Sequence, residues 1–104
     1  MTAGFAAMVS YITQNRDVME RFAKAMHEAS TYTNTHLPET VDLVAAYTGV
    51  TPDVVAKSVR FIDADYLEPR YLQPMIDLCA RYQLIDKDFP AAQVISAVAV
   101  KPPR

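Results

Sequence analysis

The chain has 104 residues, of which 51% are hydrophobic and only two are glycine, a composition that favours one ordered small domain over a disordered chain. Its formal charge of −2, with Lys and Arg scattered along the chain, is not what a nucleic-acid partner requires. We therefore expect a single helical domain over residues 1–104, with an ordered core at about 5–96, a loose tail at 97–104, no cofactor and no nucleic acid.

Cysteine usage and the amino terminus exclude further classes. Cys79 is the only cysteine, so neither an internal disulfide nor a thiolate-only metal site can form within one chain, and its apolar surroundings predict a buried small hydrophobe. The stretch MTAGFAAMVSYITQN lacks basic residues and is soon broken by polar ones. It fits neither a signal peptide nor a membrane span, so we expect no membrane insertion, and a cytoplasmic protein if this is the whole gene product.

The first segments are a short ambiguous run and then a long helix. Residues 4–14 carry Phe5, Met8, Val9 and Ile12 at helical spacing, but FAAMV could equally be a buried strand. From Asp17 onward a helix is predicted to reach about Thr33 or Thr35. Its apolar stripe, expected to be buried, consists of Val18, Met19, Phe22, Ala25, Met26, Ala29 and Tyr32.

Two shorter helices are predicted next. The first begins at Pro38 and ends before Gly49, a typical residue after a last helical turn. The second begins at Thr51-Pro52-Asp53 and is expected to turn Val54, Val55, Val59 and Ile62 inward. This helix-turn-helix spacing invites a DNA-binding interpretation, but the second helix offers too few cations.

The last part contains a connector and a fourth long helix. Residues 63–70 are acidic and lack both the spacing and the glycine of a calcium loop. Because Pro74 should interrupt any helix that starts at Pro69, the regular part is expected to begin at Gln73 or Pro74, with an ion pair from Asp77 to Arg81. Its apolar stripe consists of Met75, Ile76, Leu78, Cys79, Tyr82 and Ile85. A short helix over AAQVISAV, residues 91–98, should follow.

The order of three segments resembles a known family. RDVMERFAKAMHEASTYTNTH, PETVDLVAAYTGVTPDVV and YLEPRYLQPMIDLCARYQLIDKDFP are similar to the carboxy-terminal third of ABC-transporter substrate-binding proteins of the nitrate, sulfonate, taurine and thiamine-pyrimidine subfamily, which have the type II periplasmic-binding-protein fold. The similarity covers about residues 5–95. Arg16 stands where the family often has proline, Leu37 is inserted before Pro38, and Gln83 replaces a C-cap glycine.

The resemblance implies a mainly α fold of four to five helices, the carboxy-terminal part of a periplasmic-binding-protein-like fold that lacks most of its sheet. The implied function is a truncated or split substrate-binding component of an importer for small anions or pyrimidine precursors, periplasmic by family and unable to bind ligand alone. Helices without their sheet need other cover, so we expect a homodimer or a second chain that supplies the missing lobe. The alternative is a free-standing helical module for homodimerisation or protein interaction.

An enzyme is the least favoured hypothesis, and we expect none. The best acid-base candidates, His27 with Glu28 and His36 with Glu39, are neighbours on helix surfaces. The tyrosines that could line a ligand pocket, more often half-buried rims, are Tyr11, Tyr32, Tyr66 and Tyr71. No catalytic residue and no metal ligand is predicted, and the ligand-binding residues stay unknown.

Overall fold

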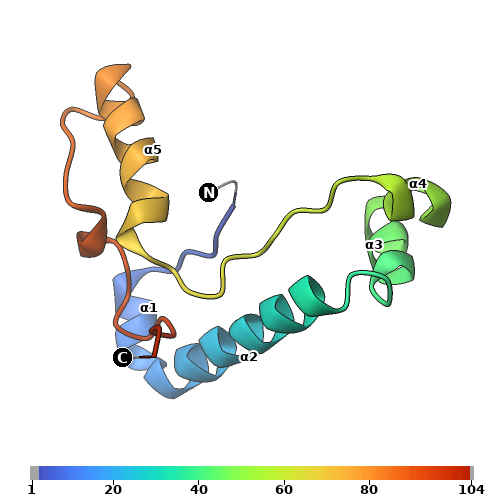
Figure 1. Cartoon of the computed structure of the whole chain (residues 1–104). Coiled ribbons are helices and arrows are strands. Elements are labelled where there is room, and N and C mark those ends of the chain that lie inside the picture. Colours follow the sequence, from blue (N-terminus) through green and yellow to red (C-terminus); the bar gives the residue numbers. More distant parts are fainter. Residues whose placement is uncertain (1–2, 104) are drawn as a thin grey trace. The chain divides into compact units, whose positions relative to one another are not determined.

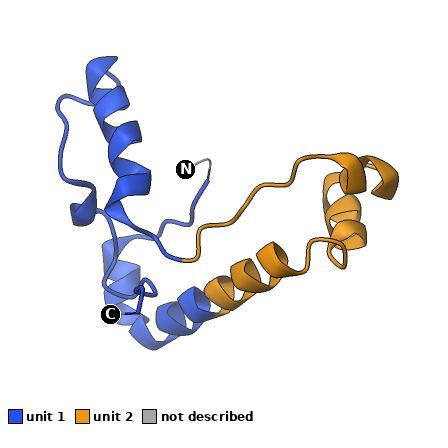
Figure 2. Cartoon of the chain, viewed as in Figure 1, with its two compact units in different colours: residues 1–24, 66–104 blue, residues 25–65 orange. Residues whose placement is uncertain are grey.

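The computed structural model describes residues 3–103, which form helices and no strand (Figure 1). The elements are α1 (Val9–Gln14), α2 (Arg16–Thr35), α3 (Val41–Thr48), α4 (Pro52–Lys57), α5 (Pro69–Arg81) and the 3-10 helix η1 (Ala91–Gln93). The predicted mainly α class is confirmed. The chain divides into two compact units, drawn in Figure 2: unit 1 comprises residues 1–24 and 66–104, and unit 2 comprises residues 25–65.

The amino-terminal ambiguity is resolved as a short helix after an irregular segment. Residues 3–8 have no regular structure, and α1 begins after Met8, whose backbone is extended. Within unit 1 the Phe5 ring meets the Phe22 ring edge to face, with centroids 5.2 Å apart. An aromatic contact, rather than strand pairing, therefore attaches this segment to α2.

The long helix α2 has the predicted extent, but its predicted stripe is not buried. Of that stripe only Met19 and Met26 are half-buried, and the other members are exposed. The better covered positions follow a neighbouring line along the helix: Met19, Ala23, Met26, Ser30 and Thr33. Periodicity fixes which residues share a face, whereas burial depends on what covers that face, and the expected cover over the full stripe is missing.

In unit 2, α3 begins at Val41 rather than at Pro38. Residues 37–40 form a turn in which the Thr40 hydroxyl donates to the Leu37 carbonyl at 3.0 Å. The Arg60 guanidinium donates to the same Thr40 oxygen at 3.1 Å. These bonds favour the turn over one more helical turn, because a threonine side chain that bonds nearby backbone competes with helix formation.

The connection from α3 to α4 follows the prediction more closely. Gly49 caps α3 in the left-handed region with φ of 72°, and Pro52 opens α4 at its first position. However, α4 ends at Lys57, and of the residues expected to face inward only Val55 is buried. Val54 is 52% exposed, Val59 101% and Ile62 71%, so the expectation is wrong for these three.

In unit 1, α5 begins at Pro69, earlier than predicted. Pro69 occupies a first-turn position, and Pro74 lies inside the helix. A proline inside a helix removes one backbone hydrogen bond and crowds the carbonyl four residues earlier, and α5 nevertheless continues past Pro74 to Arg81. Asp77 accepts a hydrogen bond from Gln73 at 2.8 Å, and no ion pair to Arg81 is present in residues 3–103.

The end of α5 forms a Schellman motif without glycine. The Leu84 N–H donates to the Cys79 carbonyl at 2.8 Å, and the Gln83 N–H donates to the Ala80 carbonyl at 3.0 Å. This places Gln83 in the left-handed region, with φ of 57°. The predicted helix over residues 91–98 is reduced to η1 at its start.

The buried core is small in both units. Among residues 3–103, the buried side chains are Ala45, Val55 and Thr40 in unit 2 and Ala91 in unit 1. Ala91 is 1% exposed, and every other residue of this described range is more than 2% exposed. Burial this limited leaves most of the apolar helix faces in contact with solvent.

Candidate functional site

The segment after α4 is held to α2 within unit 2 by two polar side chains. The Asn34 amide pairs with the Asp63 backbone twice, donating to its carbonyl at 2.8 Å and accepting from its N–H at 2.9 Å. His27 Nδ1 lies 2.6 Å from the Asp65 carbonyl oxygen. His27 thus contacts the backbone of the segment that follows α4.

A second cluster in unit 2 contains three of the residues considered for acid-base chemistry. The Tyr32 and His36 rings stack with centroids 4.2 Å apart, and the Tyr32 hydroxyl donates to Glu39 Oε2 at 2.7 Å. His36 Nδ1 lies 2.8 Å from the Thr35 hydroxyl and 3.1 Å from the Tyr32 carbonyl. The structure therefore joins His36 and Glu39 through Tyr32, not to each other.

The electrostatics of this cluster do not favour catalysis. The hydrogen bond to Glu39 raises the pKa of the Tyr32 phenol above its ordinary value, and the nearby carboxylate charge raises it further. A phenol with a raised pKa stays protonated at neutral pH, so it is a poor base and a poor nucleophile. The cluster is exposed, so its hydrogen bonds compete with water.

An open depression of about 360 Å³ lies along the same face of α2, lined by His27, Glu28, Thr31, Tyr32, Thr35 and His36. Its lining contains His27, Glu28 and His36 of the two predicted acid-base pairs, but not Glu39. Because an enzyme site usually excludes water from the reacting groups, an open helix surface of this kind provides little for chemistry.

The remaining candidates lie in unit 1. Cys79 is a free thiol on α5 and is half-buried, not buried as predicted. The Tyr71 hydroxyl accepts from Arg70 at 3.0 Å, and the guanidinium lies 4.9 Å from the centre of its ring. Tyr11 and Tyr66 also belong to unit 1, so neither belongs to the depression that contains Tyr32.

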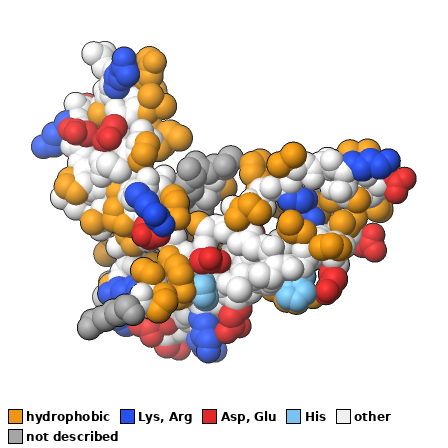
Figure 3. All heavy atoms as spheres, viewed as in Figure 1, with side chains coloured by type: hydrophobic (Ala, Val, Ile, Leu, Met, Phe, Trp, Pro, Cys, Tyr) orange, Lys and Arg blue, Asp and Glu red, His pale blue; other side chains and the backbone are white. Residues whose placement is uncertain are grey.

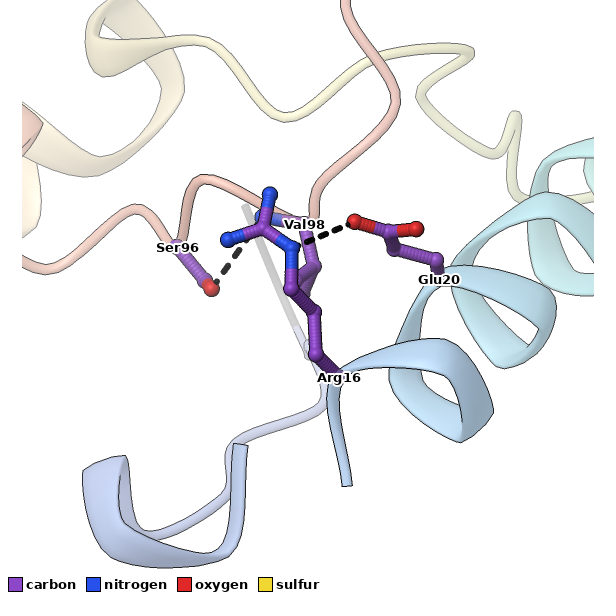
Figure 4. A network of polar contacts seen from close by, with 4 residues as sticks. All are labelled: Arg16, Glu20, Ser96 and Val98. Carbon is purple, nitrogen blue, oxygen red and sulfur yellow. Dashed lines mark hydrogen bonds and ion pairs between the residues drawn. The ribbon is translucent and has the colours of Figure 1, made fainter. Parts of the chain in front are cut away.

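A polar contact in unit 1 illustrates how little the surface charges contribute. Arg16 Nε donates to Glu20 Oε1 at 2.8 Å, and nearby the Val98 N–H donates to the Ser96 hydroxyl (Figure 4). The Arg16 and Glu20 side chains are 65% and 50% exposed. Exposed pairs of this type add little stability and indicate no ligand site.

Sequence reasoning missed Gln73 as the residue that fastens the carboxy-terminal segment to α5. Its Nε2 donates to the Phe89 carbonyl at 3.1 Å, and its Oε1 accepts from the Ala91 N–H at 2.7 Å. Ala91 is the most buried residue in the described part of the chain. The sequence singled out Gln73 only as a possible start of the helix, which does not identify its partners.

The most extensive surface feature is apolar. Figure 3 shows orange apolar side chains on α5 and on the α3–α4 hairpin. In unit 2, Leu43 is 71% exposed and Tyr47 91% exposed, and Val59 and Phe61 extend the exposed apolar surface. In unit 1 the exposed apolar residues around α5 are Leu67, Tyr71, Met75, Leu78, Tyr82 and Leu84. Exposed apolar patches occur at protein and membrane contact sites, at ligand grooves and on aggregation-prone chains.

The comparisons add no named relative. No protein-family model, no curated protein and no solved structure matches the chain. No helix within residues 3–103 is long and apolar enough to cross a membrane. Within the same residues, no group of three or more metal-binding side chains is placed to hold an ion.

Proposed function

We propose that this chain is a helical association module whose apolar faces are completed by another polypeptide. The single observation that carries the proposal is the contrast between its few buried side chains and its many exposed large hydrophobic ones.

The balance between chain entropy and apolar burial supports association with a partner. Ordering a residue costs roughly 1–2 kcal/mol of backbone entropy, and burial of apolar surface is the main contribution that offsets it. Here α2 and α5 have no buried residue at all. A partner that covers their apolar faces supplies the missing burial.

Many of the exposed large apolar side chains, among them Leu43, Tyr47 and Met75, lie on helices, which favours helix-to-protein association over ligand binding. The depression on α2 is open, and a second one at the α3–α4 connection is also a surface feature. A small-molecule site would need enclosure and convergent polar groups. We accordingly keep the expectation that this chain is not an enzyme as part of the proposal.

A second candidate function is the one that the family resemblance implies. In it, the chain is the helical part of an ABC-importer substrate-binding component, and a second chain supplies the missing lobe, with small anions or pyrimidine precursors as ligands and a periplasmic site of action. One observation supports it: Gln83 adopts φ of 57° at the position where the resembled family has a C-cap glycine. The exposed apolar faces of the helices are compatible with covering a sheet.

The test of association is hydrogen exchange of the purified chain across a dilution series. We expect the amides of α2 and α5 to gain protection as the concentration rises, because burial then requires a second molecule. Full protection in a monomer at the lowest concentration would contradict the proposal. For the second candidate, co-expression with an α/β-lobe polypeptide should yield a stable complex that binds the ligand, whereas failure to form one argues against it.

A further inference from the structure

The segment that follows α4 runs back along α2 within unit 2 (Figure 1). This segment, which we term the strap, comprises residues 58–65 and contains no helix or strand. Along the strap, the contacts are first with the turn at residues 37–40, then with Asn34 and then with His27. The strap therefore lies antiparallel to α2.

Two of these contacts involve the main chain of the strap and none of its side chains. The Asn34 amide bonds both the N–H and the carbonyl of Asp63. His27 Nδ1 lies 2.6 Å from the Asp65 carbonyl oxygen. In an extended chain the polar groups of alternate residues point to the same edge, so bonding at positions 63 and 65 is the pattern of a strand edge. Ser30 lies between Asn34 and His27 on this face, is half-buried, and is small enough to leave room for a backbone.

The third contact adds one side chain of the strap. The Arg60 guanidinium donates to the Thr40 hydroxyl at 3.1 Å and to the Leu37 carbonyl at 3.4 Å, and Thr40 is 5% exposed. Within the strap, all of which the structure describes, Arg60 is half-buried and the other seven residues are exposed. The strap is thus held by its backbone and by one arginine, while its apolar side chains stay in solvent.

We propose that this face of α2 and the turn after it form a binding site for an extended peptide, which the strap occupies within its own chain. The contacts define the occupant. It has a residue whose N–H and carbonyl bond Asn34, and an arginine three residues earlier that bonds Leu37 and Thr40. Main-chain hydrogen bonds provide affinity in such peptide sites, and individual side chains provide specificity. The inference goes beyond the proposed function and does not rest on it, because it uses none of the exposed apolar helix faces.

The strap can be replaced by another peptide because its release costs little apolar burial. Its contacts are hydrogen bonds at exposed and partly buried positions, and exchange of such bonds with water has a small net cost. Tethering gives the strap an effective concentration on the order of 1 mM at the site, so a free peptide competes poorly until the strap is weakened. A partner that adds contacts of its own to the same main-chain pattern displaces it.

The first experiment measures the binding of a fluorescent peptide of residues 58–65 to the full chain by anisotropy. Two variants of the chain weaken the strap in different ways: Asp63→Pro removes the N–H that Asn34 binds, and Arg60→Met removes the guanidinium. We expect each variant to bind the peptide at least about tenfold more tightly than the unaltered chain, because the competing strap is weakened. Asp63→Ala keeps the N–H and is the matched control, which should stay within about threefold of the unaltered chain.

The second experiment changes the peptide and the site. A peptide with proline at position 63 or methionine at position 60 should bind the Asp63→Pro chain at least about tenfold more weakly than the original peptide. Adding Asn34→Ala to the Asp63→Pro chain should weaken binding to a similar extent. Adding Thr31→Ala, at an exposed position of α2, should leave binding unchanged. Circular dichroism shows whether each variant stays helical, and Arg60→Met decides the outcome if Asp63→Pro unfolds.

The outcomes separate this inference from the proposed function. If the helical variants bind the peptide no better than the unaltered chain does, the strap does not occupy a peptide site and the inference is overturned. Equal binding of the proline peptide, or undiminished binding after Asn34→Ala, would also overturn it, because the main-chain contacts would then not determine binding. Neither result bears on association through apolar helix faces, which the dilution series tests separately.

Discussion

Replacing Gln73 with methionine tests how the carboxy-terminal segment is held to α5. Methionine matches glutamine in length and helix propensity but makes no comparable hydrogen bond. The change removes the bonds to the Phe89 carbonyl at 3.1 Å and from the Ala91 N–H at 2.7 Å. Because Ala91 is only 1% exposed, its N–H would be left buried without an acceptor, at a cost of about 1–3 kcal/mol.

That cost should appear as local opening, measured by hydrogen exchange at the Ala91 amide. A loss of about 1–3 kcal/mol corresponds to exchange faster by about 5- to 150-fold. Gln14→Met, at the exposed end of α1, is the matched control and should leave the Ala91 rate unchanged. If Gln73→Met leaves the rate at Ala91 unchanged while α5 stays helical, the fastening role assigned to Gln73 is refuted.

Four further substitutions probe the two units. Gly49 and Gln83 both lie in the left-handed region, which glycine adopts without strain. Gly49→Ala should therefore lower the thermal midpoint by the equivalent of about 1 kcal/mol, and Gln83→Gly should raise it by a similar amount. A shift of the midpoint in the same direction for both variants would contradict this. Glu39→Gln should lower the pKa of Tyr32 toward its ordinary value in an alkaline absorbance titration, and an unchanged pKa would show that Glu39 is not the cause. Because this pKa is raised on folding, any stabilisation from Tyr32 is present below its ordinary pKa and is lost as the pH rises through the raised value. Arg60→Met should speed exchange in the turn before α3, where its guanidinium donates two hydrogen bonds; unchanged exchange there would contradict its role.

Features set by local chemistry were predictable from the sequence. The long α2 followed from its apolar periodicity and capping residues, and the left-handed Gly49 followed from its place after a helical run. Gln83 adopts the same backbone region without being glycine, because two backbone bonds close the Schellman motif around it. In each case the determining interactions lie within a few residues.

Features set by non-local contacts were not predictable. Val59 was expected inside because it continued an apolar helical pattern, but the helix ends at Lys57, and the following segment is held by the Asn34 bonds to Asp63 instead. The start of α5 at Pro69 was predicted wrongly because Pro74 was expected to interrupt the helix, whereas α5 continues through it. The prediction that the α2 stripe is buried was wrong because periodicity shows which residues share a helix face but not what covers that face.

The same limits applied to the candidate site. The sequence placed His36 near Glu39 on a helix surface, and the structure brings both to one cluster through Tyr32. No spacing rule pointed to the stacked ring between them. The amide of Gln73 likewise has partners 16 and 18 residues away, which a helical pattern cannot reveal.

The most direct test of association through apolar helix faces is the solution mass of the purified chain, measured by light scattering over a dilution series with circular dichroism on the same samples. We expect a helical dimer at high concentration. Helicity should fall as dilution releases monomers, because the partner supplies the missing burial. A monomer at every concentration that keeps its full helicity would contradict it, since the exposed apolar faces would then need no partner.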